Sequence, residues 1–210
     1  MNHIVLLGDS VFDNKAYLNG GLDVITHIRR QIPAEWKASL RAIDGSVVEN
    51  VRKQTFDLPD DATHLIISVG GNDAILSADI LQQKAVSSAE VLDKLADIAN
   101  EFEYRYSEML QTVLRLKKST AVCTIYYPRI PEPFTQKIAV AALTIFNDAI
   151  IRQAFQAGVP LIDLRLVCNE DSDYANEIEP SEKGGGKIAK AILRLVNEHN
   201  FESHRTEVFV

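Results

Sequence analysis

Residues 4–10 read Ile4-Val5-Leu6-Leu7-Gly8-Asp9-Ser10. Four consecutive apolar residues indicate a strand that is buried on both faces, as the strands of a parallel sheet are. Gly8 permits a tight turn directly after that strand, and Ser10 follows at the strand's exit. In open α/β sheets, ligands bind beyond the carboxyl ends of the strands. The stretch therefore predicts an α/β fold and places the hydroxyl of Ser10 where a ligand would bind.

The rest of the chain repeats this alternation of strand and helix. Further short apolar runs predict strands at 39–43, 64–69, 120–126 and 159–162. Apolar residues at helical spacing predict helices at 21–32, 87–113, 135–157 and 181–199, the second of which begins with a capping box. No linker or repeat divides the chain. We therefore expect one three-layer α/β/α domain over residues 1–210, with about five parallel strands.

Composition and charge exclude several classes of protein. The chain is 46% hydrophobic, which excludes disorder, and its formal charge of −7 with scattered Lys and Arg predicts no nucleic-acid partner. No apolar stretch approaches the roughly 20 uncharged residues of a membrane helix, so we expect a cytoplasmic protein without a membrane partner. Cys123 and Cys168 lie in apolar contexts typical of buried free thiols, and we expect no metal or cofactor. The broad apolar face of the predicted helix 135–157 is compatible with a homodimer.

Two further strand exits carry residues that suit acyl transfer. Gly45 follows the second strand and offers a backbone N–H that no side chain obstructs, and Asn72 follows the third strand with a side-chain amide. Donors aimed at a developing oxyanion stabilise it by roughly 3–4 kcal/mol each. Ser10, Gly45 and Asn72 thus predict a nucleophile with two oxyanion donors. The alternatives are that Asp9 or Ser10 caps the next helix and that Gly45 is a turn glycine.

In the short motifs that contain these three residues, the chain resembles the SGNH (GDSL-type) hydrolases. The Ser of the family's first motif, Gly-Asp-Ser, corresponds to Ser10. The Gly of its second motif corresponds to Gly45, and the Asn of its third motif, Gly-x-Asn-Asp, corresponds to Asn72. The resemblance extends from Gly8 to the last predicted helix. It implies a flavodoxin-like fold and an enzyme that hydrolyses a small-molecule ester, with Ser10 as the nucleophile. It also implies that Gly45, Asn72 and the backbone of Ser10 bind the oxyanion.

The fourth block departs from the family's pattern. Where the family has Asp-x-x-His-Pro, this chain has Asn176-Glu177-Ile178-Glu179-Pro180. When the two motifs are aligned on the Pro, Asn176 stands at the position of the family's Asp, and Glu179 stands at the position of its His. Glu179 is then the best remaining proton acceptor, because nearby acids would raise its pKa from about 4.3 toward neutrality. The alternative is that Glu179 only precedes the helix that follows it.

The missing histidine leaves three further hypotheses open. His204, in the C-terminal tail, would be the base if the tail folded back, whereas the other four histidines are expected far from the strand exits. The domain would instead bind an acylated or glycan ligand without turnover if it were degenerate. A hard cation such as Mg²⁺ or Ca²⁺ would bind if four carboxylates converged, those of Asp9, Asp13, Asp73 and Glu179.

Overall fold

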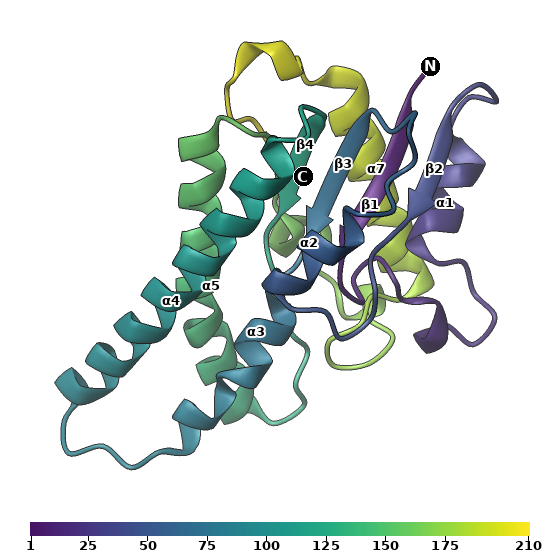
Figure 1. The fold of residues 1–210 in the computed structure, drawn as a ribbon. Coiled ribbons are helices and arrows are strands. Elements are labelled where there is room, and N and C mark those ends of the chain that lie inside the picture. The colour runs from purple at the N-terminus through teal and green to yellow at the C-terminus, as the bar shows by residue number, and fades with distance from the viewer.

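The computed structural model describes residues 1–210 and has a six-stranded parallel sheet at its centre (Figure 1). The strand order is β2-β1-β3-β4-β5-β6, and every neighbouring pair is parallel. All six carboxyl ends therefore lie at one edge of the sheet. The strands are β1 (His3–Gly8), β2 (Lys37–Leu40), β3 (His64–Ser68), β4 (Ser119–Cys123), β5 (Leu161–Ile162) and β6 (Val208–Phe209).

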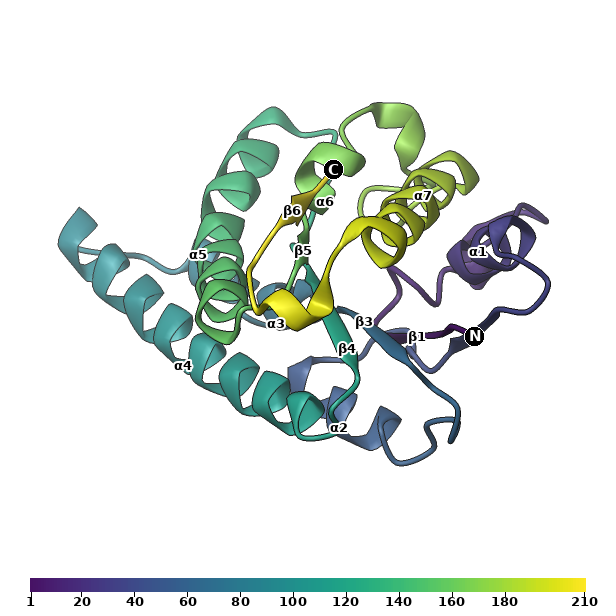
Figure 2. The ribbon, with the colours of Figure 1, turned by 90° about the horizontal axis from the view of Figure 1, so that it is seen from above.

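Helices cover both faces of the sheet, which confirms the predicted three-layer α/β/α class (Figures 1 and 2). One face carries α1 (Val24–Gln31) and α7 (Glu182–Glu198), and the other carries α2 (Val51–Gln54), α4 (Ser88–Leu114) and α5 (Pro133–Ala157). Two shorter helices are α3 (Gly71–Leu76) and α6 (Leu164–Val167). The single turns are η1 (Lys15–Tyr17), η2 (Val48–Asn50), η3 (Ala78–Gln82), η4 (Asp171–Asp173) and η5 (Phe201–Ser203).

The continuous apolar run of β1 is explained by the two layers of helices. Ile4 and Leu6 belong to the hydrophobic cluster beneath α1 and α7. Val5 and Leu7 belong to the cluster beneath α4 and α5. All four side chains are fully buried. Because successive side chains of a strand point to opposite faces, a strand between two helical layers needs apolar residues at every position.

Two strands, β2 and β4, each end three residues earlier than the sequence predicts. β2 ends at Leu40 rather than at residue 43, because the next two N–H groups share one acceptor, the carbonyl of Leu6. β4 ends at Cys123 rather than at residue 126, because the side chain of Asn147 bonds to both the N–H and the carbonyl of Ile125. These hydrogen bonds replace the ladder partners that would have continued each strand.

The sixth strand was not expected from the sequence. Residues of the C-terminal tail return to the edge of the sheet, where the N–H of Leu161 donates to the carbonyl of Glu207 and that of Asp163 to the carbonyl of Phe209, both at 2.9 Å. β6 has only two residues, which is too short for an alternation of apolar and polar side chains to be visible. The tail therefore extends the sheet instead of reaching its carboxyl edge.

Helix α5 is long and apolar enough to cross a membrane by length and composition alone, although Lys137, Asp148 and Arg152 interrupt its apolar residues. In the structure it packs along α4, and Phe146, Ala149 and Ile150 are buried against the sheet. Residues nearer its N-terminus line the cavity described below. In all, 28% of its most apolar 18-residue window is buried inside the structure.

Candidate active site

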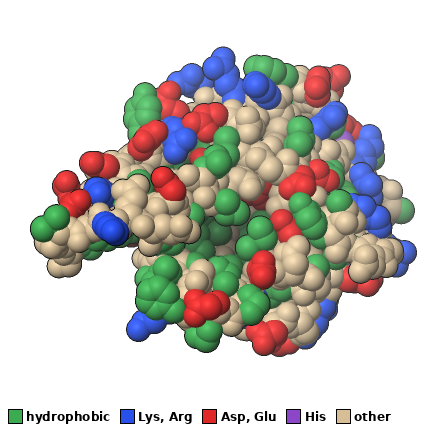
Figure 3. All heavy atoms as spheres, turned by 90° about the horizontal axis from the view of Figure 1, so that it is seen from below, with side chains coloured by type: hydrophobic (Ala, Val, Ile, Leu, Met, Phe, Trp, Pro, Cys, Tyr) green, Lys and Arg blue, Asp and Glu red, His purple; other side chains and the backbone are tan.

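The strand order reverses between β1 and β3, and a cavity lies at their carboxyl ends. The chain leaves β1 toward β2 on one side and leaves β3 toward β4 on the other, which is the point where ligands bind in such sheets. The cavity measures about 250 Å³, and 18 of its 27 lining residues are hydrophobic. Figure 3 shows this face of the molecule, hollowed and with hydrophobic side chains gathered around the hollow. Ser10 and Asn72 both line it.

Ser10 and Glu179 meet in this cavity although 169 positions separate them in the sequence. The Oγ of Ser10 donates a hydrogen bond of 3.0 Å to Oε1 of Glu179. Glu179 lines the same cavity and is only 4% exposed. A serine hydroxyl within hydrogen-bond reach of a proton acceptor is the arrangement that nucleophilic catalysis requires.

Burial raises the pKa of Glu179 to about 7. Loss of hydration is the main cause, because it disfavours the charged form. The hydrogen bond from Ser10 lowers the pKa of Glu179, and the negative charge of Asp44 contributes to raising it. The second oxygen, Oε2, is buried and has no hydrogen-bond partner, which adds to the cost of the charge. Glu179 can therefore gain and lose a proton near neutral pH.

Asn176 holds Glu179 through the backbone. Its Oδ1 accepts hydrogen bonds from the N–H groups of Ile178 and Glu179, both at 2.9 Å. The turn is closed by a bond of 2.8 Å from the N–H of Ala175 to the carbonyl of Glu179. The hydroxyl of Tyr126 fixes the turn from outside, since it donates to the carbonyl of Ile178 at 2.6 Å. Asn176 thus shapes the loop that presents Glu179 and makes no hydrogen bond to its carboxylate.

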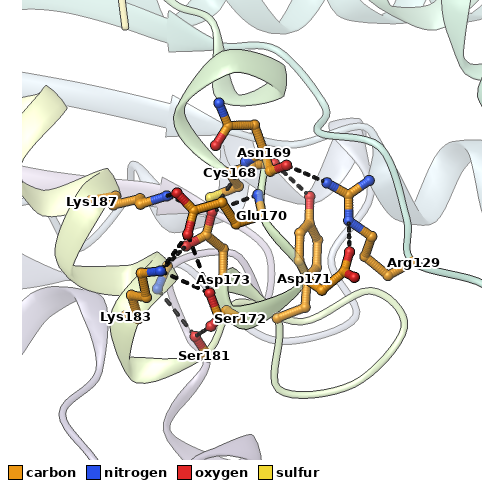
Figure 4. Close-up of polar contacts among 12 residues, drawn as sticks. Arg129, Cys168, Asn169, Glu170, Asp171, Ser172, Asp173, Ser181, Lys183 and Lys187 are labelled. Carbon is orange, nitrogen blue, oxygen red and sulfur yellow. Dashed lines mark hydrogen bonds and ion pairs between the residues drawn. The ribbon is translucent and has the colours of Figure 1, made fainter.

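A buried carboxylate fastens the start of this loop to α7 (Figure 4). Asp173 is fully buried, and its Oδ2 accepts hydrogen bonds from the N–H groups of Asn169 and Glu170 at 3.1 and 3.0 Å. Lys187 of α7 pairs with the same oxygen at 2.7 Å. A Cβ added at Gly184 would lie 2.1 Å from the carbonyl oxygen of Asp173, so only glycine fits at this helix position. The loop that ends in Glu179 is therefore held at both ends.

Two of the three candidate oxyanion donors, Ser10 and Asn72, line the same cavity. Asn72 donates one amide hydrogen to the carbonyl of Ser46 at 2.9 Å, which fixes the side chain that lines the cavity. Gly45 lies just before Ser46 in an exposed turn, and its φ of +76° is a conformation that favours glycine. The backbone N–H groups of Ser10 and Gly45 donate to no acceptor in the chain. Gly45 does not line the cavity, whereas Ser10 and Asn72 do.

A comparison with known families agrees with this arrangement. The sequence profile of the GDSL-like lipase/acylhydrolase family matches residues 6–185. The chain belongs to this family. The match includes the exits of β1, β2 and β3 and the loop that carries Glu179. Among curated proteins no match was found.

Solved structures of lipases and esterases have the same fold as this GDSL-family chain. The lipase Lip_vut3 from a goat rumen metagenome aligns with a TM-score of 0.73 at 16% identity over 96% of this chain and 100% of its own. Phospholipase A1 from Streptomyces albidoflavus aligns with a TM-score of 0.64 at 15% identity over 94% and 99%. The acetyl xylan esterase AlAXEase aligns with a TM-score of 0.66 at 18% identity over 92% and 99%. These likenesses confirm the fold, and together with the family match they support an ester hydrolase.

Asp9, beside the Ser10 of this GDSL-family site, is a second carboxyl group in the cavity wall. It is 3% exposed, and its Oδ1 accepts a hydrogen bond of 3.1 Å from the N–H of Val11. Burial, with a smaller contribution from the charges of Glu179 and Asp73, raises its pKa to about 8. The sequence indicates a capping residue or a cation ligand at Asp9, and it does not show how deeply this side chain is buried.

We expect Asp9→Asn to stabilise the protein at pH 8. The pKa of Asp9 rises from 3.8 to about 8 on folding, so the folded state binds more protons between these values. The free energy of unfolding therefore falls as the pH rises through this window. Asparagine keeps the acceptor for Val11 and carries no charge, so the free energy of unfolding should rise by roughly 1–3 kcal/mol at pH 8 and change little at pH 4. Urea denaturation of both proteins at the two pH values checks this, and a less stable variant at pH 8 would contradict it.

No histidine reaches the Ser10 site of this family member. A Cβ on Gly158, just before β5, would lie 2.5 Å from the carbonyl oxygen of His204, which places His204 at the amino ends of the strands. The hypothesis that the tail brings His204 to Ser10 is therefore wrong. His3 and His64 begin β1 and β3 at that same edge, as expected. The other two contact different partners, His27 lying against Gly186 and His199 against Glu207.

The hypothesis of a hard-cation site also lacks a geometric basis. No three His, Cys, Asp or Glu side chains are placed to share a metal ion. Asp13 accepts a hydrogen bond from the N–H of Asp44, and Asp73 accepts one from the N–H of Val48. These two carboxylates are thus engaged in separate parts of the site.

Proposed function

We propose that this GDSL-family protein is a serine ester hydrolase in which Ser10 is the nucleophile and Glu179 is the general base. The observation that carries the proposal is the hydrogen bond of 3.0 Å from Ser10 Oγ to Glu179 Oε1 in the wall of an apolar cavity. The family match and the lipase and esterase folds support the same class of reaction.

In the first step, Ser10 Oγ attacks the acyl carbon and its proton passes to Glu179 Oε1. The negative charge that develops on the carbonyl oxygen is bound by the N–H groups of Ser10 and Gly45 and by the amide of Asn72. The C–O bond to the leaving group then breaks, and protonated Glu179 returns the proton to the leaving alkoxide. Water repeats the sequence on the acyl-enzyme, again with Glu179 as the base, and releases the acid.

The surroundings of Glu179 suit it to this role. A general base works best when its pKa lies near the working pH, and an ordinary carboxylate is too weak a base for a serine hydroxyl. Burial raises the pKa of Glu179 to about 7, close to that of a histidine, which has an ordinary value of about 6.5. The turn shaped by Asn176 fixes the carboxylate in place of the Asp-His pair that the family's pattern provides.

The cavity indicates which part of the ester it binds. Its apolar walls come mainly from α3, η3, α4 and α5 and include Ile98, Ile125, Leu143 and Phe146. The polar groups, Ser10, Asn72 and Glu179, also line it. We therefore propose an ester with an aliphatic acyl chain that lies between α4 and α5 while its carbonyl faces Ser10.

Ala142→Trp is expected to block the acyl part of the cavity. Ala142 is a half-buried residue of α5 that lines the cavity, so an indole at this position would fill space that a long acyl chain needs. We expect kcat/KM for p-nitrophenyl octanoate to fall at least about tenfold, which corresponds to about 1.4 kcal/mol, while that for the acetate changes little. The matched control is Ala141→Trp, because Ala141 is exposed and does not line the cavity. Equal losses for both esters would count against this placement of the chain.

Turnover of p-nitrophenyl esters with acyl chains of two to twelve carbons tests the proposed reaction. Clear hydrolysis by the wild type, with a preference that depends on chain length, supports it. The result that would overturn it is an absence of turnover together with a rise in melting temperature on adding a long-chain ester. In that case the cavity binds an acylated ligand and stabilises the fold by mass action alone.

A further inference from the structure

A second serine, histidine and aspartate form a hydrogen-bonded chain at the opposite edge of the sheet. Nε2 of His3 lies 2.8 Å from Oγ of Ser39, and Nδ1 of His3 lies 2.7 Å from Oδ1 of Asp61. His3 begins β1, Ser39 belongs to the neighbouring strand β2, and Asp61 precedes β3. β1 has six residues and rises about 3.3 Å at each, so this group lies roughly 20 Å from the site at Ser10.

The charge of Asp61 fixes the direction of these hydrogen bonds. Hydrogen bonds from Lys37 and His3 lower the pKa of Asp61 to about 2, so it is a carboxylate at neutral pH and only accepts. In the tautomer that donates to Asp61 through Nδ1, Nε2 of His3 is the acceptor. The hydroxyl of Ser39 therefore donates to Nε2. This is the order of donors and acceptors that activates a serine in a Ser-His-Asp triad.

The group opens into a cavity of its own. His3 and Ser39 line a volume of about 420 Å³ together with Trp36, Lys37 and Arg29. The ring of His3 is 7% exposed, and Ser39 is half-buried. Arg29 is held at the wall because its Nε donates to the carbonyl of Ala38 at 3.0 Å. Its guanidinium is a fixed positive charge in the same cavity as the serine.

We propose that Ser39 is a second nucleophile, which accepts the acyl group of a small ester bound in this cavity. Ser39 Oγ bonds to the acyl carbon while its proton passes to His3 Nε2, and Asp61 stabilises the imidazolium. The C–O bond to the leaving group then breaks, and the leaving alkoxide takes the proton from His3. Water releases the acyl group by the same route. This inference does not depend on the reaction proposed at Ser10.

Acylation of Ser39 is expected to be slow. At Ser10 the oxyanion has backbone and amide N–H donors, whereas the positive charges at the Ser39 cavity are the guanidinium of Arg29 and the ammonium of Lys37, which pairs with Asp61. Loss of one aimed donor typically lowers the rate about 10²–10³-fold. The test therefore measures formation of the covalent adduct and does not rely on turnover.

Labelling with a fluorophosphonate in the Ser10→Ala background tests the proposal. The serine oxygen bonds to phosphorus and fluoride leaves, which marks any activated serine, and peptide mass spectrometry locates the mark. We expect the adduct on Ser39 in Ser10→Ala and none on that peptide in the double variant that also carries Ser39→Ala. Asp61→Asn should slow labelling at least about tenfold, because it removes the charge that orients His3. Asp60→Asn, an exposed neighbour without a hydrogen bond to His3, should leave the rate unchanged.

Two results would overturn the proposal. One is the absence of adduct on Ser39 after prolonged labelling of folded Ser10→Ala protein. The other is an equal labelling rate in Asp61→Asn and Asp60→Asn. The Asp61 side chain is about half exposed, so its replacement is compatible with folding, and a melting curve confirms this for each variant. Labelling of Ser10 in the wild type is read from a different peptide, so failure at one serine is distinguishable from failure at the other.

Discussion

Ser10→Ala is expected to lower kcat for p-nitrophenyl acetate by at least about 10³-fold. The Ser10 Oγ is the atom that bonds to the acyl carbon, and it is the cavity group in hydrogen-bond contact with Glu179. An alanine leaves the oxyanion donors in place, so a small residual rate above that of water is expected. Initial rates at pH 8 for the two purified proteins give the comparison.

Ser77→Ala is the matched control for that experiment. Ser77 also lines the cavity, and its hydroxyl donates to the carbonyl of Asp73 at 2.9 Å. Its loss removes one local hydrogen bond without touching the Ser10–Glu179 pair, so kcat should change less than about threefold. If Ser10→Ala hydrolysed the ester as fast as the wild type, Ser10 would not be the nucleophile. Any residual rate that disappears on adding Ser39→Ala belongs to the second site.

Glu179→Gln is expected to lower kcat by about 10²–10³-fold at pH 8. Glutamine has the same shape and its amide oxygen can still accept the hydrogen bond from Ser10, but it cannot take the proton. The pKa of Glu179 lies near 7 in the folded protein, above its usual 4.5, so folding stability falls as the pH rises from about 4.5 to 7. The neutral variant escapes this loss. The free energy of unfolding at pH 8 should therefore be at least that of the wild type.

Glu177→Gln controls for a change of charge in the same loop. Glu177 is exposed, and its part in the fold is a backbone carbonyl that accepts from Arg129. The substitution leaves that carbonyl in place, so kcat should stay within about threefold of the wild type. A Glu179→Gln variant that remains folded and as active as Glu177→Gln would show that Glu179 is not the base.

Much of this arrangement could be predicted because it follows from the ends of strands. The apolar run before Gly8 predicted β1, and parallel strands bring their exits to one edge, so Ser10 and Asn72 were expected to be close together. The alignment of residues 176–180 with the family's last motif predicted that Glu179 lies near Ser10. In the structure, Ser10 Oγ and Glu179 Oε1 are 3.0 Å apart. The position of Asn176 was also identified. Its bonds to backbone N–H groups were not, because they depend on the shape of the turn.

Other features could not be predicted, for identifiable physical reasons. The raised pKa of Asp9 depends on complete burial, which a polar residue at a strand exit does not reveal. The second cluster joins three separate segments of the chain, which carry His3, Ser39 and Asp61. The contact between His3 and Ser39 depends on the register of β1 against β2, and the contact between His3 and Asp61 depends on the loop before β3. Alternation along a strand shows which residues share a face, but it does not show which residue of the next strand lies opposite.

The pH dependence of fluorophosphonate labelling at Ser10, in the wild type and in Glu179→Gln, tests the central claim most directly. It follows the attack of the serine oxygen and is independent of the choice of ester and of product release. We expect the rate in the wild type to rise with pH to a plateau, with a midpoint near the pKa of about 7 of Glu179. In Glu179→Gln the rate should be low, and this rise should be lost. The same rate and the same rise in both proteins would contradict the claim that Glu179 activates Ser10.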